Sequence, residues 1–124
     1  MLTEKFYEVL NHEGVVSIVS WGAEEAHVTC TWNSYLEVTE DERILIPAAG
    51  MHSTENDVNQ NNKVKITLGA REVMGRNNYQ GTGFEIEGTA RFLTAGSDFD
   101  RMKEKYPFLN RTLEITVIAA KQLL

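Results

Sequence analysis

The segment ILIPAAGMHSTENDV, residues 44–58, joins a buried strand to a helix through a turn of small residues. The strand, from Arg43 to Ile46, is rich in apolar and β-branched residues. Pro47 has no N–H to donate to a sheet, so the strand is predicted to end there. The turn that follows, residues 48–50, reads Ala-Ala-Gly and carries no bulky side chain. A flat molecule can therefore lie against this backbone, and we expect a helix directly after it, over residues 52–60.

The start of this helix is suited to an anion. Ser53 and Thr54 stand in its first turn, with Glu55 and Asp57 behind them. Free N–H groups, hydroxyls and the positive end of the helix dipole meet there, as they do at phosphate sites. The same pattern also begins ordinary helices that bind nothing. The turn lacks the glycine spacing of a P-loop and of a dinucleotide fingerprint, so nucleoside triphosphates and dinucleotides are disfavoured.

The composition is that of one globular domain. The chain has 124 residues, of which 42% are hydrophobic and 24% charged, enough for a single core over residues 1–124. No apolar run approaches the length of a membrane span, and the N-terminus does not resemble a signal peptide, so we expect a cytoplasmic protein. The net charge of −6 disfavours nucleic acid and anionic membranes as partners, since both attract basic surfaces.

Cysteine and histidine usage argues against a metal site. Cys30 is the single cysteine and cannot form an internal disulfide, which fits a reducing compartment. His12, His27 and His52 lie on different expected elements and show no spacing typical of metal ligands. We therefore predict that the protein binds no metal.

The rest of the chain alternates between short β-strands and turns. Strands are predicted over residues 15–21, 27–32, 35–38, 43–46, 63–69, 84–93 and 113–120. Helices are predicted over residues 3–10, with Thr3 as N-cap, over 52–60, and from a cap at Ser97 to a stop at Pro107. The first four strands are expected to pair in sequence as a meander, the second half of 71–83 to form a loop, and Gly88 to mark a bulge.

This order of elements, without βαβ alternation, favours a mainly β fold. We expect a closed or partly closed antiparallel barrel. A barrel of this size has no room for a cofactor inside, so a ligand is expected on the outside, where two subunits meet.

Three segments in this order resemble the FMN-binding split-barrel superfamily, which includes the pyridoxamine 5′-phosphate oxidases and flavin reductases. They are residues 31–35 (TWNSY), 46–54 (IPAAGMHST) and 81–90 (GTGFEIEGTA). The likeness is closest to the small FMN-binding proteins of anaerobic bacteria and extends over nearly the whole chain, from Phe6 to Val117. No single motif is specific, but the ordered set is. It implies an antiparallel split β-barrel with a few short helices.

The resemblance also implies a homodimer with one FMN per subunit at the interface. The phosphate would lie at the start of the helix over residues 52–60, with donors from Ser53 and Thr54. Phe108 and Leu124 would come from the partner subunit to cover the flavin. The full set of residues expected to contact the cofactor is Cys30, Thr31, Trp32, Asn33, Tyr35, Pro47, Ala48, Ala49, Gly50, Met51, His52, Ser53, Thr54, Arg71, Phe108 and Leu124.

Two parts of this set have expected places along the cofactor. Thr31 and the backbone of Trp32 would line the ribityl chain or the edge of the ring. The small-residue turn would form a close-packed floor under the isoalloxazine, made by Pro47, Ala48, Ala49 and Gly50.

The sequence departs from the family pattern at Ser53. Relatives commonly carry a basic residue just before the threonine of this turn. A serine there removes one charge-assisted contact to the phosphate, worth about 1.5–3 kcal/mol. Arg71 and His52 are the sequence candidates for restoring that charge.

These observations predict an FMN-binding redox protein, either an electron carrier or a small flavin reductase or oxidase, with a possible redox partner protein. No Ser-His-Asp order and no setting for a nucleophilic cysteine occur, so the chemistry would belong to the cofactor. Because Ser53 weakens the phosphate site, an alternative stays open. It is a non-enzymatic split-barrel module that binds another planar or phosphate-bearing ligand, such as a B6 vitamer, haem or a deazaflavin. A structural dimer without a ligand is the third alternative.

Overall fold

The computed structural model describes residues 1–124, which form one antiparallel sheet of seven strands with three α-helices and two 3₁₀ turns around it. The helices are α1 (Glu4–Leu10), α2 (His52–Gln60) and α3 (Ser97–Lys105), and the 3₁₀ turns are η1 (Asn33–Tyr35) and η2 (Arg76–Asn78). The strands are β1 (Val15–Trp21), β2 (Ala26–Trp32), β3 (Glu37–Val38), β4 (Arg43–Ala48), β5 (Lys63–Met74), β6 (Gln80–Leu93) and β7 (Arg111–Gln122). None of the helices is long and apolar enough to cross a bilayer.

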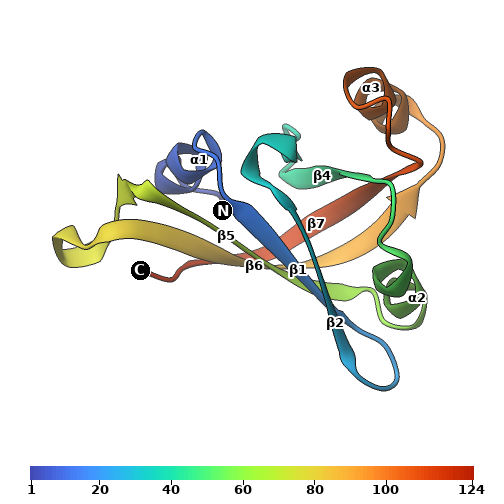
Figure 1. The fold of residues 1–124 in the computed structure, drawn as a ribbon, viewed down its shortest axis with the longest axis horizontal. Coiled ribbons are helices and arrows are strands. Elements are labelled where there is room, and N and C mark those ends of the chain that lie inside the picture. The colour runs from blue at the N-terminus through green and yellow to red at the C-terminus, as the bar shows by residue number, and fades with distance from the viewer.

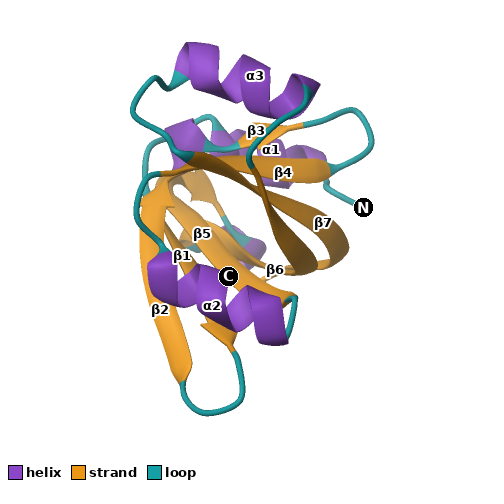
Figure 2. Cartoon of the chain, turned by 90° about the vertical axis from the view of Figure 1, so that its right-hand side faces the viewer, coloured by secondary structure: helices purple, strands orange, loops and turns teal.

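The sheet curls into a split barrel because its two edges are joined by a short piece of chain. The strand order is β2-β1-β5-β6-β7-β4-β3, so β2 and β3 are the edge strands. Residues 33–36 alone separate them, and the chain from Trp32 to Glu37 can span no more than about 18 Å. A flat sheet of this order would be about 29 Å wide, so the sheet has to bend until its edges approach. Figure 2 shows this bend, and the predicted split-barrel fold is confirmed.

The core fills the space inside the bent sheet. Ile18, Ile66 and Ile86 are fully buried there. The short helix α1 adds Phe6 and Val9, both fully buried, and the Phe6 ring meets the ring of Phe84 edge-on at 5.6 Å. As predicted, Thr3 caps this helix and accepts a hydrogen bond from the Phe6 N–H at 3.3 Å.

The predicted meander of the first four strands is wrong at one step, since β2 does not pair with β3, while the expected β1–β2 and β3–β4 pairs are present. β1 pairs with β2 and β5, whereas β3 pairs with β4, and β4 pairs with β7. The strand expected over residues 35–38 is only Glu37–Val38, because Tyr35 belongs to the 3₁₀ turn η1. This turn connects β2 at one edge of the sheet to β3 at the other.

Pro47 does not end its strand, in contrast to the prediction. β4 continues to Ala48, and Pro47 lies opposite Thr112 of β7. On the other side of β4 the short β3 pairs with Ile44 and Leu45 only. The missing N–H of Pro47 therefore removes no hydrogen bond between β4 and β3.

Several predicted strands were too short, and one predicted helix cap was wrong. β5 runs to Met74 rather than to residue 69, β6 begins at Gln80, and β7 covers Arg111–Gln122, because strand pairing carries the sheet beyond the alternating segments. The N-cap of α3 is Gly96, and Ser97 is the first helical residue instead of the cap. The bulge expected at Gly88 is confirmed by a register shift between Glu87 and Gly88, and a Cβ there would lie 2.6 Å from the Thr116 carbonyl oxygen.

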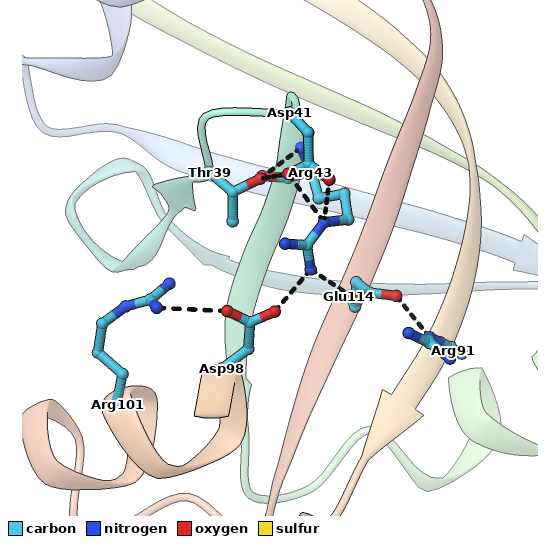
Figure 3. A network of polar contacts seen from close by, with 7 residues as sticks. All are labelled: Thr39, Asp41, Arg43, Arg91, Asp98, Arg101 and Glu114. Carbon is cyan, nitrogen blue, oxygen red and sulfur yellow. Dashed lines mark hydrogen bonds and ion pairs between the residues drawn. The ribbon is translucent and has the colours of Figure 1, made fainter. Parts of the chain in front are cut away.

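A network of charged side chains attaches α3 to the sheet (Figure 3). Nη1 of Arg43 in β4 donates to Asp98 of α3 and to Glu114 of β7, each at 2.6 Å. The second oxygen of Glu114 accepts from Arg91 of β6. Glu114 is 4% exposed, and burial alone would raise its pKa, but the hydrogen bonds from Arg91 and Arg43 outweigh burial and lower it.

We expect Arg43→Ala to destabilise the fold by about 3 kcal/mol, since the buried Glu114 would keep only one of its two cationic partners, Arg91, and Asp98 would lose its bond to the sheet. Urea unfolding at neutral pH measures this loss. The control is Lys65→Ala, which removes an exposed lysine 3.5 Å from Glu87 and should cost about 1 kcal/mol or less. Similar losses in the two variants would contradict a structural role for the Arg43 network.

Candidate functional site

A groove of about 270 Å³ lies between the end of β2 and the end of β4, and we call it the β2–β4 groove. Three segments that are distant in the sequence line it. They contribute Thr29, Cys30, Thr31, Trp32, Tyr35, Pro47, Ala49, Gly50, Met51 and Phe108. All of these except Thr29 are residues that the sequence had singled out for a cofactor. The structure therefore brings the two main predicted segments together on one surface.

Gly50 leaves open space in this groove. A Cβ placed on Gly50 would have no atom within 4 Å, and its backbone does not adopt a positive φ. Neither the backbone nor the packing of this subunit therefore requires a glycine here. What the missing side chain provides is access to the backbone from the groove. Ala48 does not share this position, because it is fully buried within β4.

Aromatic side chains stand along the groove. The ring centroids of Tyr35 and Phe108 are 5.8 Å apart, and Tyr106 lies 5.2 Å from Tyr35 and 6.0 Å from Phe108. Phe108 is 51% exposed and Trp32 is 47% exposed, so both retain free surface for a planar ligand. Phe108 thus has a place in the groove of its own subunit, which the sequence analysis did not expect. Its role toward a partner stays a prediction.

The start of α2 adjoins the groove at Gly50 and Met51. Met51 is the N-cap residue, adopts a left-handed conformation with φ 63°, and makes no side-chain cap. The first helical hydrogen bond runs from the Glu55 N–H to the Met51 carbonyl at 2.9 Å. The N–H groups of His52, Ser53 and Thr54 precede it and donate to no acceptor within the protein. Together with the helix dipole, they form a positive, uncapped helix end.

Arg111, at the start of β7, lies beside this helix end. Both of its Nη atoms donate to the Gly50 carbonyl, Nη1 at 3.1 Å, and its Nε is 3.4 Å from the Glu55 carboxylate. The guanidinium lies 5.2 Å from the centre of the Phe92 ring. The sequence analysis missed Arg111, because the contact depends on the pairing of β7 with β4, which places Arg111 opposite Ala48.

Asn33 lies outside the groove and fixes the η1 turn. It is fully buried, and its Nδ2 lies 3.3, 2.9 and 3.1 Å from the carbonyl oxygens of Val9, His12 and Gly69, which share its two N–H groups. These bonds join η1 to α1 and β5. The side chain of Asn33 therefore fixes the position of η1 beside the groove but does not line the groove.

Arg71 and Leu124 also lie outside the β2–β4 groove. They line a second pocket, of about 540 Å³, with Ala70, Tyr79, Gln80, Gly81 and Thr82. In Figure 1 the turn between β5 and β6 and the C-terminus are at the left, whereas α2 is at the right. Within one subunit, Arg71 is therefore not placed to supply a charge at Ser53.

Asp57 of α2 connects the helix to the β1–β2 hairpin. Its carboxylate accepts from the Ser20 hydroxyl at 2.8 Å and pairs with His27 Nδ1 at 2.7 Å. Farther along, Asn61 Nδ2 donates to the Trp21 carbonyl at 3.0 Å. The hydrogen bond to Asp57 raises the pKa of His27, and the same bond lowers the pKa of Asp57. Because β2 and the start of α2 border the same groove, Asp57 fixes their relative position.

The fold and the groove define an antiparallel split-barrel protein, and comparisons agree. A family model described as pyridoxamine 5′-phosphate oxidase matches residues 2–123. The chain is 45% identical over 124 residues, and over the full length of both chains, to the FMN-binding protein of Nitratidesulfovibrio vulgaris (strain DSM 19637 / Miyazaki F). The chain therefore belongs to the pyridoxamine 5′-phosphate oxidase family, as the resemblance in the sequence predicted.

Solved structures with low sequence identity share the fold. HupZ of Group A Streptococcus superposes with a TM-score of 0.79 at 16% identity, covering 99% of this chain and 94% of that one. An FMN-binding protein of Syntrophomonas wolfei subsp. wolfei gives a TM-score of 0.77 at 17% identity, covering 99% and 86%. At these identities the likeness concerns the fold alone.

We expect the stability contributed by His27 to depend on pH. The raised pKa of His27 means that its contribution is complete below its unfolded value, about 6.5, and is lost as the pH rises through the folded value. The lowered pKa of Asp57 means that its contribution is present above about 3.9 and is lost as the pH falls through the folded value. The pair is thus strongest between about pH 4 and 6.5.

Urea unfolding midpoints of the parent and of His27→Ala across this range measure the effect. The two should differ most near pH 5, and the difference should shrink as the pH rises through the raised folded pKa of His27. His12→Ala serves as the control, because it removes an exposed imidazole that has no carboxylate partner. A difference for His27→Ala that stays constant with pH would contradict the ion pair.

Proposed function

We propose that the protein is an FMN-binding redox protein that works as a homodimer, either as an electron carrier or as a small flavin reductase or oxidase. Its family membership and the 45% identical relative named an FMN-binding protein support the proposal. The observation that carries it is local: an open groove with exposed aromatic walls meets an uncapped helix end at Gly50 and Met51.

The residues of the groove fit the parts of FMN. The space over Gly50, between Trp32 and Phe108, suits a flat ring, and the free N–H groups of residues 52–54 suit a phosphate. Thr31 and the Trp32 backbone would line the ribityl chain or the ring edge, and Ser53 and Thr54 would donate to the phosphate. When bound, FMN would supply the redox chemistry, while the protein would orient it and limit its contact with water.

A second subunit would complete the site. The groove of one subunit, about 270 Å³, is smaller than the roughly 300–1,000 Å³ typical of small-molecule pockets. Large apolar side chains also stay exposed, among them Val28 at 68%, Ile118 at 53% and Leu124 at 51%. A two-fold symmetric partner would cover such surfaces and bring apolar groups, Leu124 among them, over the flavin. We place the dimer in the cytoplasm, where the exposed Cys30 would stay reduced.

One feature favours a second candidate function. Ser53 is exposed and uncharged at the helix end, so the first turn of α2 carries no lysine or arginine for a phosphate. The lack of a lysine or arginine there would weaken FMN binding. It favours a non-enzymatic module for another planar or phosphate-bearing ligand, such as a B6 vitamer, haem or a deazaflavin. The visible absorption spectrum of the freshly purified protein separates the two, because flavin, haem and B6 vitamers absorb differently.

We expect the purified protein to show a flavin spectrum, or to acquire one when FMN is added. Gly50→Val should weaken FMN binding by about tenfold or more, because the new side chain fills the open space in the groove. Fluorescence titration measures binding, and thermal unfolding should show that the fold is unaffected. A parent protein that stays colourless with FMN would refute the proposed cofactor, and unchanged affinity in Gly50→Val would refute its place over Gly50.

We also expect a dimer in sedimentation equilibrium. Apolar groups over a flavin disfavour its anionic reduced form, so removing Leu124 or replacing Phe108 with alanine should raise the two-electron reduction potential. A redox titration of the two variants beside the parent provides the measurement. A monomeric parent, or a potential that does not move when Leu124 is removed, would remove the idea that a partner covers the flavin.

A further inference from the structure

One cation contacts the turn that leads into α2, and it comes from another strand. Arg111 begins β7, and its guanidinium reaches across to the carbonyl of Gly50. Gly50 lines the β2–β4 groove and stands two residues before the uncapped helix. The positive charge of Arg111 is therefore held where the groove and the helix end meet.

The guanidinium keeps donors available. Of its five N–H groups, one from each Nη is donated to the Gly50 carbonyl, and the Nε faces Glu55 at 3.4 Å. One N–H on each Nη has no acceptor in the protein. These two N–H groups lie on opposite sides of the guanidinium, because the pair that faces the Gly50 carbonyl lies between them, so each can donate singly to a phosphate oxygen.

Packing fixes the orientation of this group. The Arg111 side chain is 11% exposed, and its guanidinium lies 5.2 Å from the centre of the Phe92 ring. At such low exposure, water screens the charge less than it screens a surface lysine. Arg111 therefore needs little ordering to meet an anion, which lowers the entropic cost of binding.

The surroundings of the helix end make a cation necessary for a phosphate. The chain carries a net charge of −6, and Glu55 places a carboxylate in the first turn of α2. A dianion at the free N–H groups of residues 52–54 would be repelled by Glu55. Arg111 is already paired with Glu55, so its charge reduces the repulsion between this carboxylate and the phosphate.

We propose that Arg111 binds the phosphate of FMN together with the N–H groups of His52, Ser53 and Thr54, and supplies the charge that Ser53 does not. The inference rests on the proposed function, because it assigns a residue to the phosphate end of that same site. Within one subunit Arg111 takes the role expected of Arg71, which lies with Leu124 in the second pocket. The phosphate is thereby held jointly by β7 and α2.

Comparing FMN with riboflavin tests the proposal, since riboflavin lacks the phosphate. We expect Arg111→Gln to raise the Kd for FMN about tenfold or more and to change the Kd for riboflavin less than about twofold. Arg91→Gln is the control, because it removes the same charge from a strand arginine that is paired with Glu114 instead. It should leave the ratio of the two affinities unchanged.

Two further variants test the same contact with a gain in affinity. Glu55→Gln removes the competing carboxylate and should tighten FMN severalfold without tightening riboflavin. Ser53→Lys in the Arg111→Gln background should restore the preference for FMN, while Ser53→Lys alone should change it much less. Neither result can arise from a loss of folding.

The outcomes separate the inference from the proposed function. If the parent binds FMN but Arg111→Gln weakens FMN and riboflavin equally, Arg111 only supports the Gly50 turn, and the inference fails while the function stands. The inference fails in the same way if neither affinity changes. If the parent binds neither flavin, the proposed function fails and the inference fails with it.

Discussion

The short connection between β2 and β3 is the constraint on which the rest of the structure depends. Residues 33–36 join the two edges of a seven-stranded sheet, so the sheet has to close around its core. Asn33 fixes this corner. Its backbone N–H donates to the Gly14 carbonyl at 2.9 Å, and the two N–H groups of its side-chain amide are shared among three further carbonyls. The closure brings the end of β2 against the end of β4. The β2–β4 groove is therefore a consequence of how the sheet closes.

The segments with strong local signals were predictable from the sequence. The helix over residues 52–60 has the predicted bounds, because the small-residue turn before it and the polar asparagines after it limit it locally. The strand pairing was not predictable in the same way. Alternating side chains indicate a strand but not its neighbour. The expected pairing of β2 with β3 was therefore wrong, while the split-barrel resemblance gave the right fold.

The same distinction explains the site. Trp32 and Gly50 lie in segments that the family resemblance identified, and the structure unites them in one groove. Arg111 has no local motif, and its contact with Gly50 spans 61 positions of the chain. Such a contact follows from the register of β7 against β4, so it becomes visible only in the folded protein.

The turn and the helix start beside the groove are locally less stable than they could be. Met51 adopts a left-handed conformation that costs a non-glycine residue about 1–3 kcal/mol, and the helix after it has no cap. Contacts elsewhere offset this cost: Asp57 holds α2 to the hairpin, and the Arg43 network holds α3. A strained turn beside free donors is typical of a place prepared for a ligand, since a purely structural helix would gain by being capped.

A positive charge beside the α2 start behaves differently when it comes from a strand arginine than when it comes from a lysine on the helix. A lysine on the helix itself would be a flexible, strongly hydrated charge that has to be ordered when an anion binds. A strand arginine that is stacked beside Phe92 and bound to the Gly50 carbonyl is ordered beforehand. It also connects the helix end to the sheet, because the bond to Gly50 and the pair with Glu55 involve both sides of the turn. With Arg111 in that position, the turn at residues 48–51 is held from β7 even though the helix after it lacks a cap.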